Sequence, residues 1–371
     1  MYFTTAIYLF QNHFKTAFED FITPGVLLNG VIFFSLITFS LVAFTYLYLG
    51  LKKKSFFFKE KIKKSLELWI SHVILSEDEE ETSNIPDKFS KMFRNPAARQ
   101  YAIEHLITNK KTFSGAVAEN IRHLYEKLGF KNDSLKKLAS NFWHLRAKGI
   151  QELSIMDQND QLIKIYRLTN SRNELVRNEA QNAIIKWSGF NGLRFLDVIT
   201  YDISEWQQIQ LLEFLKLFTQ QDMPKLPKWL SSNNNSVVLF ALKLAEVYQQ
   251  FAVKQKVEEC LLHADEKIRV QAVNTLARIG DDVSADKIIS RYDDETITNQ
   301  LNILSKLPLL AEERHLNFLQ QQLMNENDFI KLSAAKALGV MHQLEIVQQK
   351  AAEQPEPYEH IYKHVKAELA F

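Results

Sequence analysis

The sequence predicts an all-α protein in which one membrane-spanning helix precedes a long series of repeated helix pairs. Three observations carry this prediction: an uncharged run near the N-terminus, a recurring helix-start pattern after it, and a scarcity of turn residues. Only 10 glycines and 8 prolines occur in 371 residues. These are too few for the turns of a many-stranded β sandwich or for the glycine-rich loops of nucleotide-binding folds.

The charge balance is neutral overall. The chain has 45 Lys and Arg residues against 44 Asp and Glu residues, and residues 65–371 hold 37 against 41. A mildly acidic body of this kind does not attract phosphate backbones, so we expect no nucleic-acid partner. The single cysteine, Cys260, excludes an internal disulfide framework and a Cys-based zinc cluster. An unpaired thiol fits a reducing compartment.

Residues 21–51 contain no charged side chain. This run exceeds the ~20 residues that a helix needs to cross the hydrocarbon core of a bilayer. Tyr46 and Tyr48 stand near one end, where aromatic rings favour the membrane interface. We therefore expect a transmembrane helix over 25–51, preceded by a short extracytoplasmic or interfacial segment over 1–24.

The flanks of this helix predict its orientation. Residues 52–64 hold seven lysines and one glutamate, whereas residues 1–51 hold only Lys15 against Glu19 and Asp20. Because positive residues stay on the cytoplasmic side, we expect a single-pass protein of the inner or plasma membrane with its N-terminus outside and its C-terminal part in the cytoplasm. A cleaved signal peptide is a poorer match, since its apolar region is shorter and follows basic residues. Residues 52–88 are expected to form a basic juxtamembrane stalk and an acidic hinge, SEDEEET over 76–82.

The basic flank allows two interpretations. It is a stop-transfer signal whose side chains reach the lipid headgroups, or it is a specific sensor of anionic lipid. Its members are Lys52, Lys53, Lys54, Lys59, Lys61, Lys63 and Lys64.

A helical repeat unit is clearest at Asp265–Gly280. Ile268, Ala272, Leu276 and Ile279 recur at the spacing of one helix face. Asp265 stands where an N-cap residue is needed, since its carboxylate can accept bonds from the first unpaired N–H groups. The small Ala272 lets a neighbouring helix approach closely.

The same pattern recurs along the chain: a cap, two residues, an aliphatic residue, a basic residue, then a spaced Ala and Leu. Its further starting points are 29 to 41 residues apart, and each interval has room for a second helix. They are Asn95, Asn132, Asn173, Asp202, Asn234, Asp294 and Asn327.

This pattern resembles HEAT repeats, particularly the short bacterial HEAT-like units of phycobilisome-lyase-type proteins. The resemblance implies a right-handed α-solenoid of HEAT-like helix pairs over residues 89–371, whose motif-bearing helices line a concave face. It also implies that the basic fifth motif residue joins the caps of adjacent repeats in a structural ladder, although an anion clamp is the alternative interpretation. The ladder residues are Arg99, Arg177, Asp265, Arg269 and Lys331.

Signatures of enzymatic chemistry are sparse. The sequence has no glycine-rich phosphate loop, no H-E-x-x-H and no G-x-S-x-G. His360 and His364 share one helix face at zinc-binding spacing, but no third ligand is evident. The five scattered tryptophans are interpreted as helix-packing residues, and the pairs Asp281–Asp282 and Asp293–Asp294 as helix caps. We therefore expect no cofactor, no metal and no enzymatic activity.

The leading functional prediction is a membrane-anchored cytoplasmic scaffold or adaptor that binds a membrane-associated protein through the concave face of the solenoid. Analogy with bacterial HEAT-like proteins suggests a membrane glycosyltransferase or a signalling protein as the partner. The alternatives are a HEAT-fold enzyme, either bilin-lyase-like or metal-dependent, and an anionic-lipid sensor. The candidate partner-binding residues occupy the tenth motif position: Glu104, Asn182, Lys243, Asn274 and Lys336.

Overall fold

The computed structural model describes residues 24–75, 87–219 and 223–369. Within these ranges the chain consists of α-helices joined by turns and short 3-10 segments, and it contains no β-strand. The predicted all-α class is thus confirmed for the described residues. The predicted interfacial segment and the acidic hinge over 76–82 lie outside them, apart from residue 24.

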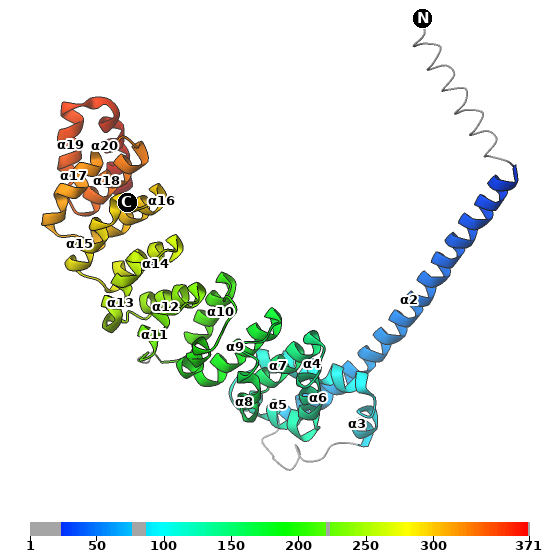
Figure 1. The fold of residues 1–371 in the computed structure, drawn as a ribbon. Helices are drawn as coiled ribbons and strands as arrows, with labels where there is room; N and C mark the ends of the chain where they lie inside the picture. The colour runs from blue at the N-terminus through cyan, green and yellow to red at the C-terminus, as the bar shows by residue number, and fades with distance from the viewer. Residues whose placement is uncertain (1–23, 76–86, 220–222, 370–371) are drawn as a thin grey trace, which may run out of the picture. The chain divides into compact units, whose positions relative to one another are not determined.

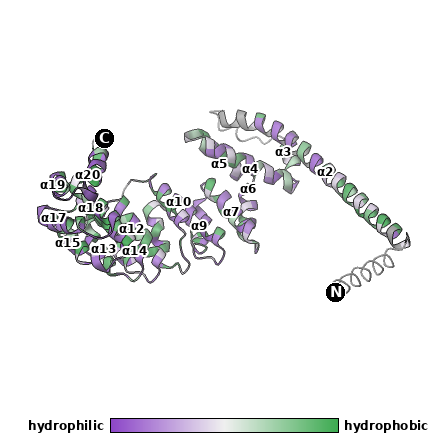
Figure 2. Ribbon diagram, turned by 90° about the horizontal axis from the view of Figure 1, so that it is seen from above, coloured by the Kyte–Doolittle hydropathy of each residue, from purple (hydrophilic) through white to green (hydrophobic). Residues whose placement is uncertain are grey.

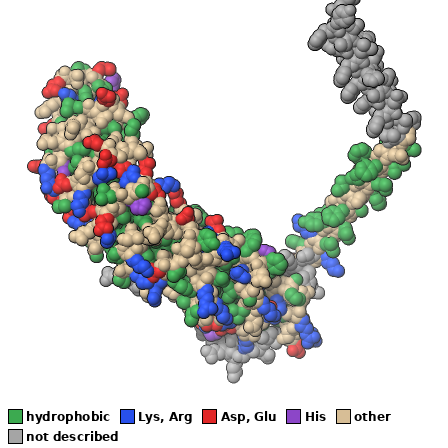
Figure 3. Space-filling view, viewed as in Figure 1, with side chains coloured by type: hydrophobic (Ala, Val, Ile, Leu, Met, Phe, Trp, Pro, Cys, Tyr) green, Lys and Arg blue, Asp and Glu red, His purple; other side chains and the backbone are tan. Residues whose placement is uncertain are grey.

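The first described element, α2 (Pro24–Leu75), is one helix of 52 residues. Its segment Leu28–Lys54 is long and apolar enough to span a membrane, and none of it is buried in the protein. Figure 2 shows mainly apolar residues along this first part of α2, and Figure 3 shows apolar side chains covering it. The expected span over 25–51 and the first part of the expected stalk belong to this one helix, since no glycine or proline follows Gly50 within α2.

The structure divides into two compact units, residues 1–130 and 131–371. In the first unit α3 (Asp87–Met92), α4 (Pro96–Thr112) and α5 (Gly115–Lys127) accompany α2. Trp69 of α2 stacks on Phe89 of α3 with ring centroids 4.6 Å apart. We expected residues 89–371 to form one repeat domain, but the structure assigns 89–130 to the unit that contains α2.

The second unit is a series of short helices that follow one another in chain order (Figure 1). α7 packs on α9, α9 on α10, α12 on α14, α14 on α16, α16 on α18, and α18 on α20. Shorter helices alternate with them, as expected for repeated pairs. The helices that lie in this unit, wholly or from residue 131 on, are α6 (Phe130–Leu138), α7 (Trp143–Ile155), α8 (Leu162–Tyr166), α9 (Glu174–Ser188), α10 (Glu205–Leu215), α11 (Leu226–Leu230), α12 (Asn235–Val247), α13 (Lys254–Glu259), α14 (Glu266–Ile279), α15 (Asp282–Ser290), α16 (Ile297–Lys306), α17 (Leu316–Leu323), α18 (Asp328–Val340), α19 (Leu344–Glu353) and α20 (Pro355–Leu369).

The helix starts in this unit are more regular than the sequence suggested. Successive packed helices from α7 to α18 have N-caps 30 or 31 residues apart, at Phe142, Asn173, Ser204, Asn234, Asp265, Thr296 and Asn327. We number positions within each of these helices from the cap as position zero. Four of the seven caps are those the sequence predicted.

Three predicted starting points are wrong. Asn132 lies inside α6, and the corresponding helix begins after Phe142, whose side chain makes no capping hydrogen bond. Asp202 and Asp294 each stand two residues before the true cap. There Ser204 and Thr296 cap their helices, because each hydroxyl accepts a hydrogen bond from the N–H three residues later.

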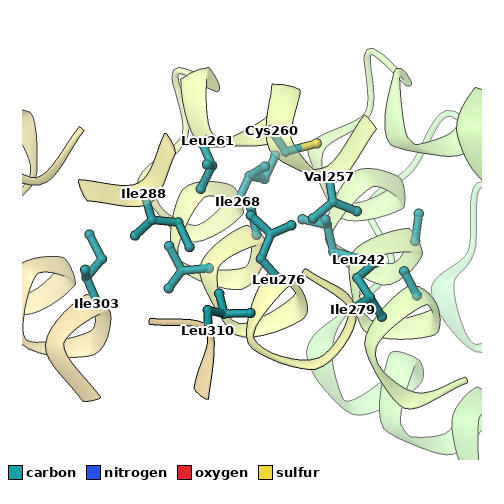
Figure 4. Close-up of a cluster of buried hydrophobic side chains, with 14 of the residues drawn as sticks. Leu242, Val257, Cys260, Leu261, Ile268, Leu276, Ile279, Ile288, Ile303 and Leu310 are labelled. Atoms are coloured by element: carbon teal, nitrogen blue, oxygen red, sulfur yellow. The ribbon is translucent and has the colours of Figure 1, made fainter. Parts of the chain in front are cut away.

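The core of the second unit is a continuous layer between helices (Figure 4). Leu242, Ile268, Leu276 and Ile303 come from α12, α14 and α16 and are fully or almost fully buried. Ala272 and Ala334, both at position seven, have no exposed surface. The expectation that small side chains lie at the helix contacts is therefore confirmed.

Candidate protein-binding surface

The basic residue at position four connects each helix start to its surroundings. Arg269 donates from Nη1 to the carbonyl oxygens of His263 and Ala264, at 2.9 and 3.0 Å, in the loop before its own helix. Its Nε and Nη2 donate to both carboxylate oxygens of Glu295, at 2.6 and 3.0 Å, just before the next cap. Burial alone would raise the pKa of Glu295, but the hydrogen bonds from Arg269 lower it.

Arg177 makes the same loop contacts with a different outer partner. Its Nη1 donates to the carbonyls of Ser171 and Arg172, both at 3.0 Å. Its guanidinium stacks 4.5 Å from the ring centroid of Tyr201, in the loop before the next cap. In the first unit, Arg99 similarly donates to the carbonyl of Gly129 at 3.0 Å and lies over Phe130.

Two further residues at position four, which the sequence pattern missed, make the same kind of contact with the loop before their helix. Arg146 of α7 donates to the carbonyl of Ser140 at 3.0 Å, and Gln208 of α10 donates to that of Ile203 at 3.1 Å. Lys331 instead pairs with Asp328 of its own first turn, at 2.7 Å. Asp265 caps α14 and also accepts a hydrogen bond from Asn235 of the preceding repeat, at 2.8 Å. The printed contacts of these residues lie within the protein, and that of Lys331 stays within its own helix.

Two of the tenth motif residues, at position nine, contact a neighbouring helix of the second unit. Asn182 accepts a hydrogen bond from Gln207 of α10 at 3.0 Å, and Lys336 pairs with Glu368 of α20 at 2.7 Å. Lys243 and Asn274 are half-buried, and only Glu104, in the first unit, is exposed. Side chains already engaged in this way are less available to a partner than we expected.

An exposed apolar patch lies instead on the first turns of α7, α9 and α10. Trp143 is 49% exposed, Leu175 53%, Trp206 66% and Ile209 49%. Leu175 and Trp206 share position two of neighbouring helices, and Trp143 stands at position one of α7. Two exposed tryptophans and two exposed aliphatic residues therefore lie near the starts of three helices that pack in series, α7 on α9 and α9 on α10.

This patch corrects the interpretation of the tryptophans. Trp229 is buried and its Nε1 donates to Asp197 at 2.9 Å, as a packing residue does. Trp143 and Trp206 do not share this behaviour. The sequence could not separate the two kinds, because the exposed ones are recognised only from the helix register.

The following helices carry polar groups at the same place. Position two of α12 is Ser236, whose hydroxyl accepts a hydrogen bond from the N–H of Ile203 at 2.9 Å. Position two of α14 is Lys267, which lies 3.8 Å from Glu205 at position one of α10. This contact reaches across α12, between the first turns of α10 and α14. The exposed Phe329 of α18 stands apart from the patch, because α12, α14 and α16 come between them in the series of helices.

The described side chains form no candidate metal centre. In these ranges no three His, Cys, Asp or Glu residues are grouped so that they could hold a metal ion. His360 and His364 are exposed, and their nearest acidic partners are Glu356 and Glu368, at 3.7 and 3.6 Å. Burial raises the pKa of the Cys260 thiol to about 11, which makes it a poor nucleophile.

The acidic pairs occupy helix ends. Asp281 caps α15 by accepting from the N–H of Ser284 at 3.0 Å, and Asp282 pairs with Arg314. Asp294 pairs with Arg291 at 2.7 Å. No calcium loop is formed by these residues, which all belong to the described part of the chain.

No protein-family model matches this sequence, and no curated protein matches it. Solved structures resemble it only loosely. Two are engineered proteins with 12% identity: one covers 57% of this chain and 96% of its own at a TM-score of 0.30, and the other 82% and 99% at 0.35. A third, an array of TOG domains from a microtubule polymerase that recruits tubulin, has 12% identity, covers 78% and 80%, and has a TM-score of 0.28.

These low TM-scores carry no argument about function. The helices and their contacts by themselves define a helical repeat protein. One N-terminal helix in this chain is in addition long and apolar enough to span a membrane.

Proposed function

We propose that this chain is a single-pass membrane protein whose second unit binds another protein. The observation that carries the proposal is the exposed patch of Trp143, Leu175, Trp206 and Ile209 on three consecutive helix starts. Tryptophan is the residue most enriched at binding hot spots, where it contributes a large apolar area with few rotatable bonds.

The geometry suggests the kind of segment that fits the patch. Packed helices lie 8–10 Å apart, so Trp143, Leu175 and Trp206 form a row with about that spacing. Seven residues of an α-helix rise about 10.5 Å. A partner helix with apolar residues every seven positions would therefore match the row.

The membrane anchor supports the same proposal. Leu28–Lys54 has no protein cover, and its apolar side chains need a lipid environment. The lysines that follow favour the N-terminus outside and residues 65–371 in the cytoplasm. In this arrangement the anchor raises the concentration of the patch near other membrane proteins, which form the partner class that we propose.

We further propose that the second unit is a right-handed, HEAT-like solenoid with the patch on its inner side. The 30–31-residue register and the Lys267–Glu205 contact across α12 support this. A membrane glycosyltransferase or a signalling protein remains the suggested partner by analogy of fold alone.

The test is a mild-detergent purification of the full chain from its native membrane, with co-purifying proteins identified by mass spectrometry. We expect a specific partner that is lost in the double variant Leu175→Ala with Trp206→Ala. Phe329→Ala is the matched control, because Phe329 is 71% exposed at the same position of α18 but lies outside the patch. Equal recovery with both variants would refute the patch as the binding site.

Topology is tested separately by cysteine labelling. Asn120→Cys should react with an impermeant maleimide only after the cells are opened. Labelling of this position in intact cells would overturn the cytoplasmic assignment, whatever the outcome for the partner.

A further inference from the structure

The lysines after the membrane segment belong to the continuous helix α2, and this continuity fixes how they are arranged. Lys52, Lys53, Lys54, Lys63 and Lys64, whose side chains the structure describes, form what we call the basic collar. Residues eleven apart in an α-helix lie only about 20° apart around its axis. Lys52 and Lys63 therefore share one side, Lys53 and Lys64 a second, and Lys54 points to a third.

The collar is open to its surroundings. Lys52, Lys53, Lys54 and Lys64 are exposed, and Lys63 is half-buried. Among the described groups its only acidic partner within 4.0 Å is Glu67, which lies 3.9 Å from Lys63. Further along, α2 contacts the rest of its unit at Ser65 with Lys88 and at Trp69 with Phe89.

Exposed aromatic rings lie between the cations. Phe56 and Phe57 are both exposed and meet edge to face with centroids 6.0 Å apart. The ammonium of Lys53 lies 6.0 Å from the ring centroid of Phe57. A stop-transfer signal needs only charges at the end of the span. Here described cations recur about three turns beyond Leu51, at Lys63 and Lys64, and the five lysines lie on three sides of the helix.

We propose that the basic collar binds the phosphate groups of anionic phospholipids and gathers them around α2 where it leaves the bilayer. Each ammonium is a compact point charge with three donors for phosphate oxygens. A lysine near an anionic membrane surface favours association by on the order of fivefold. This inference rests on the proposed membrane insertion of Leu28–Lys54 but not on the proposed protein partner.

The test uses the full chain in mixed micelles of a mild detergent with equal amounts of phosphatidylglycerol and phosphatidylcholine. Native mass spectrometry then counts the lipids that stay bound. We expect the chain to retain phosphatidylglycerol over phosphatidylcholine by tenfold or more. Replacing all five collar lysines by Gln should bring the ratio close to one.

Two controls separate charge from folding. The same five lysines changed to Arg keep the charge and should keep the preference. The variant Leu175→Ala with Trp206→Ala should also keep it, so that a failure of the partner proposal does not affect this result. Resistance of every variant to alkaline extraction from membranes reports insertion independently.

The proposal is overturned if the wild-type chain retains both lipids equally, or if the five-Gln variant keeps the preference. A third arm adds millimolar inorganic phosphate to the same mixed micelles. Displacement of the bound phosphatidylglycerol by inorganic phosphate would identify a site for free phosphate and would also overturn the lipid assignment.

Discussion

Helices α9 and α10 differ from α12 and α14 at one position of a shared pattern. At position two, α9 and α10 expose Leu175 and Trp206, whereas α12 and α14 carry Ser236 and Lys267. At position seven all four place a fully buried apolar residue, namely Ala180, Leu211, Ala241 and Ala272. Position seven is thus buried and apolar in all four helices, whereas position two ranges from the buried Ser236 to the exposed Trp206. The proposed binding role of Trp206 rests on this difference.

The largest expected effect tests whether the two regions share one kind of core. Ala180→Glu in α9 and Ala272→Glu in α14 each bury an unpaired charge, which costs about 3–5 kcal/mol of unfolding free energy. Denaturant unfolding followed by circular dichroism should show similar losses for both variants. A large loss for only one of them would break the comparison, since the two helices would then not be equivalent.

The next largest expected effect is a difference in stability loss between α9 and α14 when the arginine at position four is replaced. Arg269→Ala leaves the buried carboxylate of Glu295 without its cation, so we expect a loss of about 3 kcal/mol. Arg177→Ala removes hydrogen bonds to carbonyls and a ring contact but leaves no buried carboxylate without a cation. It should lower the free energy of unfolding by about 1–2 kcal/mol. Unfolding curves of the two variants measure the difference. Equal losses would show that the ion pair with Glu295 adds nothing beyond the loop contacts.

The patch itself should matter for binding and little for folding. Trp206→Ala should weaken partner binding by about 2 kcal/mol or more, roughly 30-fold, if Trp206 is a hot spot. Its effect on unfolding should stay within about 0.5 kcal/mol, because two-thirds of the side chain is already exposed. Affinity and stability are measured on the same preparation, with Lys267→Ala as the control from α14. A stability loss as large as the binding loss would mean that Trp206 is a packing residue after all.

The smallest expected effect depends on pH and concerns Asp281, the N-cap residue of α15. Hydrogen bonds from Lys254 and from the N–H of Ser284 lower the pKa of Asp281 from its ordinary 3.8 to about 2. A lowered folded-state pKa stabilises the fold above the ordinary pKa, and this stabilisation is lost as the pH falls toward 2. Asp281→Asn should therefore be less stable than the wild type at pH 6, and the difference should shrink between pH 4 and pH 2. A difference that does not change with pH would contradict this assignment.

How far the sequence could predict the structure depended on local chemistry. The caps Asn173, Asn234, Asp265 and Asn327 could be identified because each side chain supplies an oxygen that a helix start requires. Phe142 supplies none, so nothing local marked the start of α7. For Ser204 and Thr296 an acidic residue two positions earlier was the more conspicuous candidate.

The candidate site was less predictable than the fold. The tenth motif residues looked free on a single helix, but Asn182 and Lys336 find partners on the next packed helix. Trp206 and Trp229 looked alike in sequence, yet one is exposed and the other is buried. Only the packing of neighbouring helices distinguishes them.

The sequence by itself determined the all-α class, the long apolar helix and the small buried residues such as Ala272 and Ala334. These follow from composition, hydrophobic periodicity and capping, which act within one or two helical turns. The tertiary structure decided the 30–31-residue register, the continuity of α2 with the basic collar, and which side of each helix faces solvent. The reason is physical: a helix contains its own hydrogen bonds, but the exposure of a side chain depends on the helix that packs beside it, about thirty residues away along the chain.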